Sequence, residues 1–258
     1  MKNEPLKIAI SSQKGGVGKT TLTVLVASYL HYVKGNNVTV FDCDFPQHSI
    51  HEMRERDVEM VMNDTRFKQL AQKQFEKLGR SAYRIIETSA PKVEEELRLY
   101  QQNEHDKIDY IFFDLPGTLN SSGVVKTLAT MDILLVPIIA DRVVMESSLQ
   151  FVTALRDNIM TTGKGNIKAI YLIWNMVDRR ESNNLYRIYE QIISELGFES
   201  FQTYLPDTKK FRKELFENGT VFRSTLFPID KSFTRYCRVD EFVEEFITVL
   251  KQIDHGQE

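Results

Sequence analysis

Short apolar runs alternate along this chain with longer segments in which apolar residues recur at helical spacing. We expect the apolar runs to be strands, at residues 6–10, 38–41, 83–87, 108–113, 133–136, 169–174 and 201–205. We expect helices over about 20–30, 49–80, 91–100, 124–129, 143–160, 185–196 and 240–253, and on either side of Gly219. This alternation predicts a mostly parallel sheet with helices on both faces. The expected fold class is therefore a single doubly wound α/β domain spanning residues 1–258.

Polar residues follow directly after most of the predicted strands. They are Asp42, Asp44, Asp114, Asn175 and Asp207. In open parallel sheets, ligands bind in the crevice at the carboxyl ends of the strands. The pattern therefore predicts a binding site at this edge of the sheet.

The stretch 12–21 reads SQKGGVGKTT and lies between the first predicted strand and the first predicted helix. A glycine-rich turn in that place lets backbone N–H groups close around a phosphate, and the helix N-terminus adds partial positive charge. The pattern puts Lys19 on the β- and γ-phosphates and the Thr20 hydroxyl on magnesium. The general pattern expects glycine where this chain has Gln13, and Lys14 is an extra cation before the glycine pair. We predict a nucleotide site here.

Three carboxylates are candidates to complete this site. Asp114 ends an apolar strand, where a P-loop enzyme places the carboxylate that holds magnesium through water. Asp42 and Asp44 lie two residues apart, so on an extended backbone both side chains point to one side. One of them can support the metal shell while the other orients the attacking water. The alternative for all three is an ordinary strand-end or turn residue.

The composition is that of a soluble globular protein, with 42% hydrophobic and 27% charged residues among 258. No apolar run is long enough to span a bilayer, and the first residues lack the apolar region of a signal peptide. We expect a cytoplasmic protein with no membrane attachment. Cys43 and Cys237 form neither a disulfide framework nor a metal motif.

The net charge of −3 conceals an asymmetry near the end of the chain. Residues 209–238 carry eight basic and three acidic side chains, whereas residues 239–258 carry one basic and six acidic side chains. The basic segment is a candidate surface for a polyanion, and the acidic segment is not.

The chain resembles the ParA/MinD group of P-loop ATPases, both in its P-loop and in further segments that follow the family's order over nearly the whole length. They read QKGGVGKTT, DCDFPQ, IFFDLPG, DILLVP, WNMVD and LPD. A lysine in the place of Lys14 defines the deviant Walker A motif of this group, and ParA-like members often carry glutamine in the place of Gln13. Within the group, the chain is similar to ParA-like ATPases encoded with conjugative transfer systems, the TraA type.

This resemblance implies a fold of the SIMIBI class and an ATP-bound homodimer in which Lys14 of one subunit contacts the phosphates held by the other. The catalytic residues it implies are Lys14, Lys19 and Asp44. With the candidates above, the expected nucleotide contacts are Gly15, Gly16, Val17, Gly18, Lys19, Thr20, Thr21, Asn175, Pro206 and Asp207, and the expected Mg²⁺ group is Thr20, Asp42 and Asp114. Asn175 and Asp178 also have the spacing of the guanine-reading NKxD pattern, but Met176 replaces its lysine, which favours ATP.

For ParA-like members the resemblance implies nonspecific DNA binding by the ATP dimer and slow hydrolysis stimulated by a partner, here a ParB-like or transfer-system protein. The candidate DNA contacts are Arg179, Arg180, Lys209, Lys210, Arg212 and Lys213. Solvated helix faces are the plain alternative for these residues. The predicted final helix has mainly acidic polar residues, so we do not expect it to dock on a membrane as a MinD tail does.

The function expected from these observations is an ATPase switch that positions, segregates or regulates the transfer of plasmid or mobile-element DNA. Two alternatives remain. One is a nucleotide-controlled adaptor that positions proteins without touching DNA, and the other is a metabolic P-loop ligase, which would not need Lys14. The Met- and charge-rich segment 50–80 matches nothing in the resemblance, and we expect it to be a helical cover of the sheet.

Overall fold

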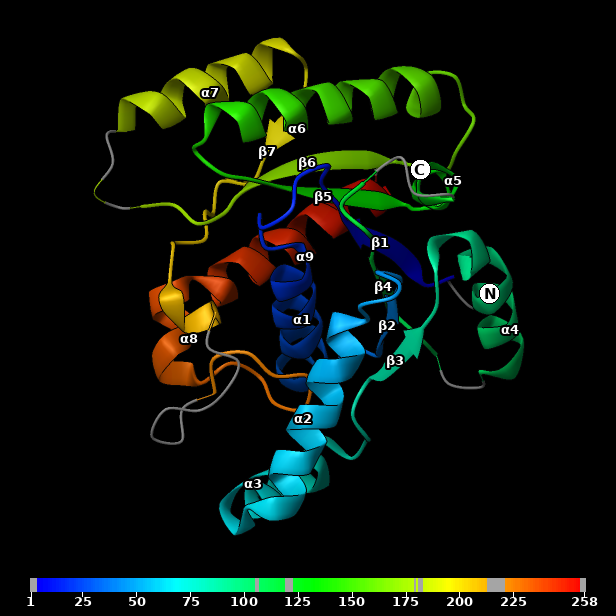
Figure 1. Ribbon diagram of the computed structural model, residues 1–258, viewed down its shortest axis with the longest axis vertical. Coiled ribbons are helices and arrows are strands. Elements are labelled where there is room, and N and C mark those ends of the chain that lie inside the picture. The colour runs from blue at the N-terminus through cyan, green and yellow to red at the C-terminus, as the bar shows by residue number, and fades with distance from the viewer. Residues whose placement is uncertain are drawn as a thin grey trace.

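The computed structural model describes residues 4–104, 107–118, 123–178, 180, 183–212 and 221–255. Its centre is a sheet of seven strands in the order β3-β2-β4-β1-β5-β6-β7, and every pairing between them is parallel (Figure 1). The strands are β1 (Leu6–Ile10), β2 (Val38–Asp42), β3 (Arg84–Glu87), β4 (Tyr110–Asp114), β5 (Ile133–Ile138), β6 (Ala169–Trp174) and β7 (Glu199–Ser200). The expected doubly wound α/β fold is confirmed.

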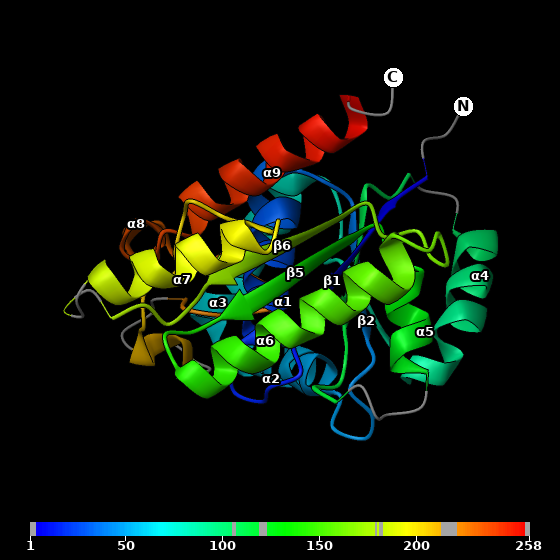
Figure 2. The same ribbon diagram turned by 90° about the horizontal axis from the view of Figure 1, so that it is seen from above.

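Helices cover both faces of this sheet, and Figure 2 shows α6 and α9 on opposite sides of it. The α-helices are α1 (Lys19–Tyr29), α2 (Ser49–Asn63), α3 (Thr65–Leu78), α4 (Val93–Asn103), α5 (Val124–Ala129), α6 (Arg142–Leu155), α7 (Asn183–Glu195), α8 (Lys231–Cys237) and α9 (Val239–His255). Single turns of other helix types are η1 (Leu30–Lys34), η2 (Ala90–Lys92), η3 (Arg156–Met160) and η4 (Lys209–Arg212). No helix in the described part of the chain is long and apolar enough to cross a membrane.

Side chains alternate in direction along the central strands and so divide the core into two layers. In β1, Ile8 and Ile10 pack with α1, α8 and α9, whereas Ala9 packs in the layer of α4, α5 and α6. Successive side chains of a strand point to opposite faces, so one short apolar run supplies both layers. Both layers are buried, which explains why the central strands read as continuous apolar runs.

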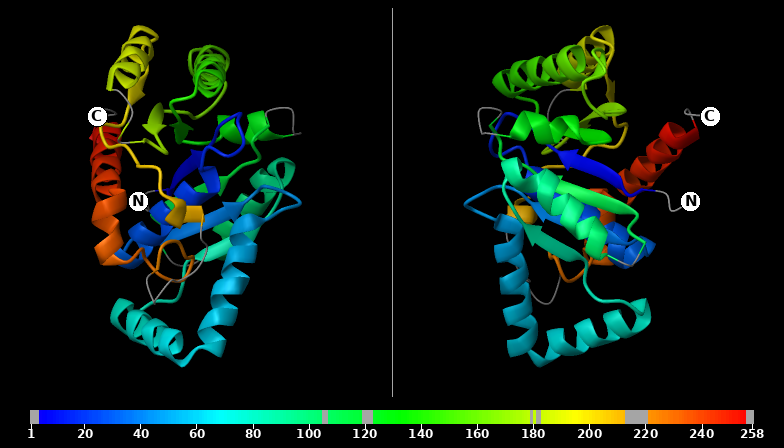
Figure 3. Two further views of the ribbon diagram at one scale, coloured as in Figure 1. Left: turned by 60° about the vertical axis from the view of Figure 1, so that its left-hand side comes forward. Right: turned by 90° about the vertical axis from the view of Figure 1, so that its right-hand side faces the viewer.

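The segment expected to be one helical cover of the sheet is a helical hairpin. The Asp64 carboxylate accepts hydrogen bonds from the backbone N–H groups of Arg66 and Phe67, which ends α2 and begins α3. The start of α2 reaches the sheet core through Ile50 and Met53, and the end of α3 packs against the same core through Phe75 and Leu78. The rest of the hairpin projects away from the sheet in both views of Figure 3, and α3 packs through Ala71 on the segment around Phe227.

The predicted strand 201–205 is wrong, because β7 ends at Ser200. The N–H of Phe201 still donates to the Leu172 carbonyl, at 2.9 Å. The next two N–H groups, of Gln202 and Thr203, donate instead to the Glu245 carboxylate of α9, at 2.6 and 2.8 Å. A side chain thus takes the place of the strand partner at these two residues, and the backbone returns to β6 only at Leu205, whose N–H donates to the Trp174 carbonyl at 2.8 Å.

Strand β5 runs further than predicted, through Pro137 to Ile138. The pairing of β1 with β5 ends at Leu135, so the N–H that Pro137 lacks removes no bond from that ladder. Of the helices expected on either side of Gly219, the described residues contain η4 before it and α8 after it, and residues 213–220 lie outside the description.

Substituting Glu245 should destabilise the fold, because the N–H groups of Gln202 and Thr203 would lose their acceptor. We expect Glu245→Ala to lower the free energy of unfolding by about 1–3 kcal/mol, as measured by urea titration. Glu244→Ala is the matched control, because Glu244 makes an exposed ion pair with Lys34 and such pairs contribute about 0–1 kcal/mol. Equal stability of the two variants would contradict the role given to Glu245.

Candidate functional site

The loop between β1 and α1 has the backbone geometry of a phosphate cradle. Gly16 and Gly18 have φ angles of +77° and +91°, which L side chains rarely adopt. A Cβ atom at Gly18 would also lie 2.5 Å from Asn175 Nδ2. Asn175 in turn donates a hydrogen bond of 2.8 Å to the carbonyl of Val17, so the end of β6 braces the loop.

The sheet register brings Asp114 to the start of this loop. In the pairing of β1 with β4, Ile10 lies beside Asp114, the last residue of its strand. The Thr20 hydroxyl at the start of α1 donates to Asp114 Oδ2 at 2.7 Å, and Lys19 Nζ donates to the Lys14 carbonyl at 3.4 Å. Two segments separated by 94 residues thus meet at one hydrogen bond.

Burial dominates the electrostatics of Asp114. The side chain is 1% exposed, and this burial raises its pKa from 3.8 to about 7, partly opposed by the Thr20 hydrogen bond. Its other oxygen, Oδ1, is buried without a hydrogen-bond partner among the described residues. A hydroxyl beside a carboxylate oxygen with spare acceptor capacity fits Mg²⁺, which takes oxygen ligands and retains several waters.

The two carboxylates around Cys43 do not share one side of the site. Asp42 is fully buried, and its Oδ2 accepts from the N–H groups of Ile50 and His51 at 2.9 and 3.0 Å, so it fixes the start of α2. Burial raises the pKa of Asp42 as well. Asp44 lines the cavity described below and Asp42 does not, because the chain turns after β2.

A cavity of about 730 Å³ opens over the cradle at the carboxyl edge of the sheet. It is lined by Gln13, Gly15, Gly16, Gly18, Lys19, Thr20, Thr21, Asp44, Phe45, Gln47, Ser49, Pro116, Gly117, Thr118, Met176, Phe211 and Arg223. Both sequence neighbours of Lys14 line this cavity, but Lys14 does not.

The predicted base-binding segments meet at a smaller hollow beside this cavity. An isolated bridge pairs Val177 with Pro206, and the N–H of Asp207 donates to the Val177 carbonyl at 3.0 Å. Asn175, Pro206 and Asp207 line the hollow together. Gly18, Thr21, Met176 and Phe211 line both spaces, so the two adjoin each other.

Ten cavity residues were not among the site residues predicted from the sequence, namely Gln13, Phe45, Gln47, Ser49, Pro116, Gly117, Thr118, Met176, Phe211 and Arg223. Phe45 and Gln47 come from the turn after β2, Phe211 from η4, and Arg223 from the segment before α8. Arg223 donates through one guanidinium nitrogen to Thr21 Oγ1 at 2.7 Å. Its place in the basic segment was the only sequence signal, and charge density alone did not separate it from its neighbours.

The predicted DNA contacts do not form one patch that the structure describes. Arg179 and Lys213, and the side chain of Arg212, lie outside the description. The exposed Arg180 makes an ion pair with Asp178 at 2.7 Å. Lys210 Nζ lies over the rings of Phe222 and Phe233, 4.9 and 5.1 Å from their centroids, and Lys209 is exposed beside it in η4.

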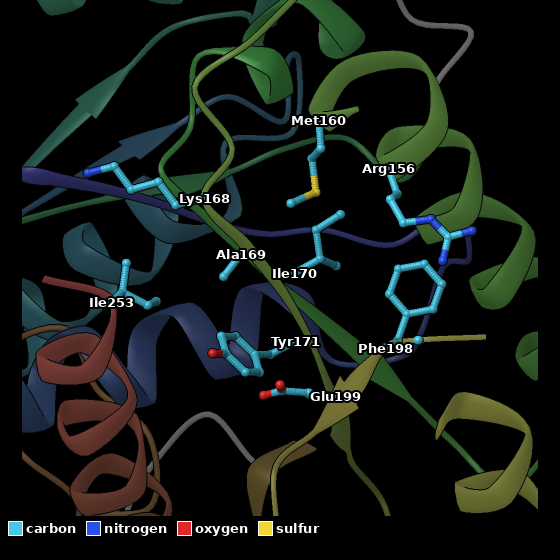
Figure 4. Close-up of a pocket in the computed structure, with 10 residues that line it drawn as sticks. Arg156, Met160, Lys168, Ala169, Ile170, Tyr171, Phe198, Glu199 and Ile253 are labelled. Carbon is cyan, nitrogen blue, oxygen red and sulfur yellow. The ribbon is translucent and has the colours of Figure 1, made fainter. Parts of the chain in front are cut away.

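A further cavity of about 480 Å³ lies at the opposite edge of the sheet, where β6 and β7 begin (Figure 4). Arg156 lies over the Phe198 ring in this cavity and makes an ion pair with Asp157, and Lys168 is paired with Asp132. Its cations are thus already engaged, and its lining contains no glycine-rich loop. The groups that could bind a phosphate, the glycine-rich loop and Lys19, lie at the carboxyl edge of the sheet.

Replacing Asp114 by asparagine should change how stability depends on pH in the nucleotide-free protein. Because the pKa of Asp114 is about 7 in the folded chain and 3.8 ordinarily, its proton stabilises the fold fully below about pH 4, and this stabilisation is lost as the pH rises through 7. The asparagine side chain does not titrate, so the stability of the variant does not fall for this reason as the pH rises. Between pH 5 and pH 8, the free energy of unfolding of Asp114→Asn relative to wild type should rise by about 2–3 kcal/mol.

Urea titrations without Mg²⁺ at the two pH values measure this difference. Comparing the variant with wild type at each pH cancels the titration of all other groups. A difference between the two proteins that does not change with pH would contradict the raised pKa.

Comparisons with solved structures identify similar folds. A putative plasmid partition protein from Borrelia burgdorferi bound to AMPPNP matches with a TM-score of 0.62 and 18% identity, over 95% of this chain and 99% of that one. A ParA of pNOB8 bound to nonspecific DNA matches with a TM-score of 0.58 and 21% identity, over 96% and 99%. MinD from Aquifex aeolicus, in a complex with MinC, matches with a TM-score of 0.53 and 18% identity, over 81% and 84%.

At these identities the structures establish the fold alone. No curated protein matches the sequence significantly. A family model does match, over residues 8–221, which is most of the chain and includes the cradle, Asp114 and Asn175. The chain belongs to the family of the CobQ/CobB/MinD/ParA nucleotide-binding domain.

Proposed function

We propose that this protein is an ATP-dependent dimerising switch that hydrolyses ATP to ADP and phosphate and, when ATP-bound, associates with DNA. One observation carries the proposal above the others. The cradle lines a nucleotide-sized cavity that adjoins the hollow of the base-binding segments, and Asp114 accepts a hydrogen bond from Thr20 in the lining of that cavity, whereas Lys14 beside the cradle does not line it. A cation placed there is available to a second subunit.

The cradle, the base-binding segments and the metal group each have a part in this proposal. The backbone N–H groups of residues 15–20 and the Lys19 ammonium hold the phosphates, and Asn175, Pro206 and Asp207 receive the base. Thr20 and Asp114 would hold Mg²⁺, which when bound neutralises charge on the β- and γ-phosphate oxygens. Asp42 stays a predicted member of the metal group, although its Oδ2 is engaged by the start of α2.

Hydrolysis needs a water aligned with the bond between the γ-phosphorus and its bridging oxygen. Asp44 lines the cavity and is the carboxylate that we assign to orient that water. As the bond breaks, charge grows on the γ-phosphoryl and bridging oxygens, and Lys14 of the second subunit stabilises it. A chain without this cation is a slow enzyme, so dimerisation and a partner that perfects the geometry both regulate turnover.

The biological role we propose is partition of DNA or regulation of its transfer, with a ParB-like or transfer-system protein as the stimulating partner. The basic residues of η4 support DNA binding, because Phe211 of the same turn lines the nucleotide cavity and places Lys209 and Lys210 next to it. Closure around ATP in a dimer would bring two such turns into one assembly. Salt-dependent, sequence-independent affinity is then expected.

A protein-positioning adaptor that does not bind DNA is a second candidate. It is favoured by the pairing of Arg180 with Asp178 and by the aromatic rings beneath Lys210, both of which draw a cation away from a phosphate backbone. The two candidates share the nucleotide cavity and differ only in what the closed dimer binds.

A gel-shift assay with Asp44→Ala separates these candidates, because this substitution should retain ATP and block its hydrolysis. We expect the ATP-loaded variant to retard duplex DNA of any sequence at low salt, and the shift to disappear at moderate salt or with ADP. Lys209→Gln combined with Lys210→Gln should weaken the shift without changing ATP affinity. Absence of any ATP-dependent shift at low salt would refute DNA binding and favour the adaptor.

A further inference from the structure

Arg223 is a cation inside the nucleotide cavity that the P-loop pattern does not include. It comes from a segment 202 residues beyond its contact, Thr21, and its guanidinium donates to Thr21 Oγ1 at 2.7 Å. Lys19, Thr20 and Thr21 line the same cavity. Arginine matches the geometry of phosphate oxygens with two parallel donors, which makes its place among these residues informative.

The backbone next to Arg223 is held by a buried polar cluster. Ser224 and Thr225 are 2% and 0% exposed. Asp57 Oδ2, from α2, accepts hydrogen bonds from Ser224 Oγ at 2.9 Å, Thr225 N at 2.6 Å and Thr225 Oγ1 at 2.7 Å. Arg54 donates to Thr225 Oγ1 at 2.9 Å and to the Thr225 carbonyl at 3.0 Å. These bonds hold the backbone next to Arg223 in place before a ligand binds.

Two further bonds tie this cluster to α1, the helix that begins at the cradle. The Ser28 hydroxyl donates to the Ser224 carbonyl at 2.7 Å, and the Tyr32 hydroxyl, just beyond α1, donates to the Thr225 carbonyl at 2.7 Å. The segment that carries Arg223 is therefore locked to both α1 and α2. A contact held this way loses little conformational entropy when the ligand arrives.

The place of Thr21 indicates which part of a nucleotide Arg223 would meet. Thr21 lines both the phosphate cavity and the small hollow of Asn175 and Pro206. Between the terminal phosphates and the base, a nucleotide has its α-phosphate and its ribose. Of these two groups, only the α-phosphate is negatively charged. It is therefore the group that the Arg223 guanidinium, which is bonded to Thr21, would recognise.

We propose that Arg223 binds the α-phosphate of the nucleotide and that Asp57 is the positioning residue that holds Arg223 in place through Ser224 and Thr225. This inference rests on the proposed function, because it requires that the cavity bind a nucleoside triphosphate. It makes Arg223 a contact for ATP and ADP alike, in contrast to Lys14, which acts on the γ-phosphoryl group of ATP.

The experiment compares the affinities of wild type, Arg223→Gln and Arg223→Lys for fluorescent ATP and ADP analogues. We expect Arg223→Gln to weaken both nucleotides by about tenfold or more and by similar factors, because a hydrogen bond to a charged group is lost. Arg223→Lys should lie between the two, since lysine keeps the charge and loses the paired donors. Arg235→Gln is the matched control, because Arg235 is exposed on α8 and does not line the cavity.

Positioning by Asp57 is tested in a double-mutant cycle. Asp57→Asn alone should weaken both nucleotides, whereas in the Arg223→Gln background it should weaken them no further. Ser224→Ala replaces Asp57→Asn if the latter fails to fold, and the same non-additivity is expected. Additive losses would remove Asp57 from the proposal.

The outcomes separate this inference from the proposed function. Wild-type affinity of Arg223→Gln for both nucleotides would overturn the inference and leave the proposed function standing. A loss for ATP without a loss for ADP would overturn it also, because the α-phosphate is common to both. A wild-type protein that binds neither nucleotide would refute the proposed function, and this inference with it.

Discussion

The hydrogen bond between Thr20 Oγ1 and Asp114 Oδ2 is the contact on which the rest of the site depends. It joins the start of α1 to the end of β4, and it exists because β1 and β4 are neighbours with Ile10 in register with Asp114. A carboxylate buried at that point would be costly by itself. The Thr20 hydroxyl and the Lys19 ammonium offset part of that cost. Asp114 therefore closes the contact between β4 and α1 and also supplies a candidate metal ligand.

Local pattern predicted much of this structure. The strands β1 and β6 have the predicted bounds, since each is a central apolar run with a polar residue after it. The cradle, Asp114 and Asn175 were predicted as site residues on the same grounds, because each lies at the end of a strand or the start of a helix. Their meeting at one edge of the sheet, where Asp114 and Asn175 are hydrogen-bonded to the cradle, follows from parallel strands having their carboxyl ends at one edge.

What the sequence did not predict depends on contacts between distant segments. Residues 201–205 are apolar enough for a strand, but the Glu245 carboxylate, some 40 residues later, takes two of their N–H groups. Asp42 and Asp44 were expected on one side, and the turn that separates them is fixed by the start of α2. Arg223 lines the cavity from a segment whose next two residues are bonded to a buried carboxylate on α2. The spacing of apolar and polar residues along the chain does not indicate which distant segments will contact each other.

The cavity of one chain is lined by the cradle, including Thr20 of the candidate metal group, and adjoins the base-binding segments, but Lys14 does not line it. The central claim is that a second subunit completes the site, and a mixing experiment with two inactive variants tests it most directly. Lys14→Ala keeps its own Asp44, and Asp44→Ala keeps a Lys14 to donate, so a mixed dimer contains one complete site. The account predicts that each variant alone binds ATP without turning it over and that the mixture recovers a fraction of the wild-type turnover. Full turnover by Lys14→Ala alone, which a metabolic ligase would show, or no recovery on mixing, would contradict it.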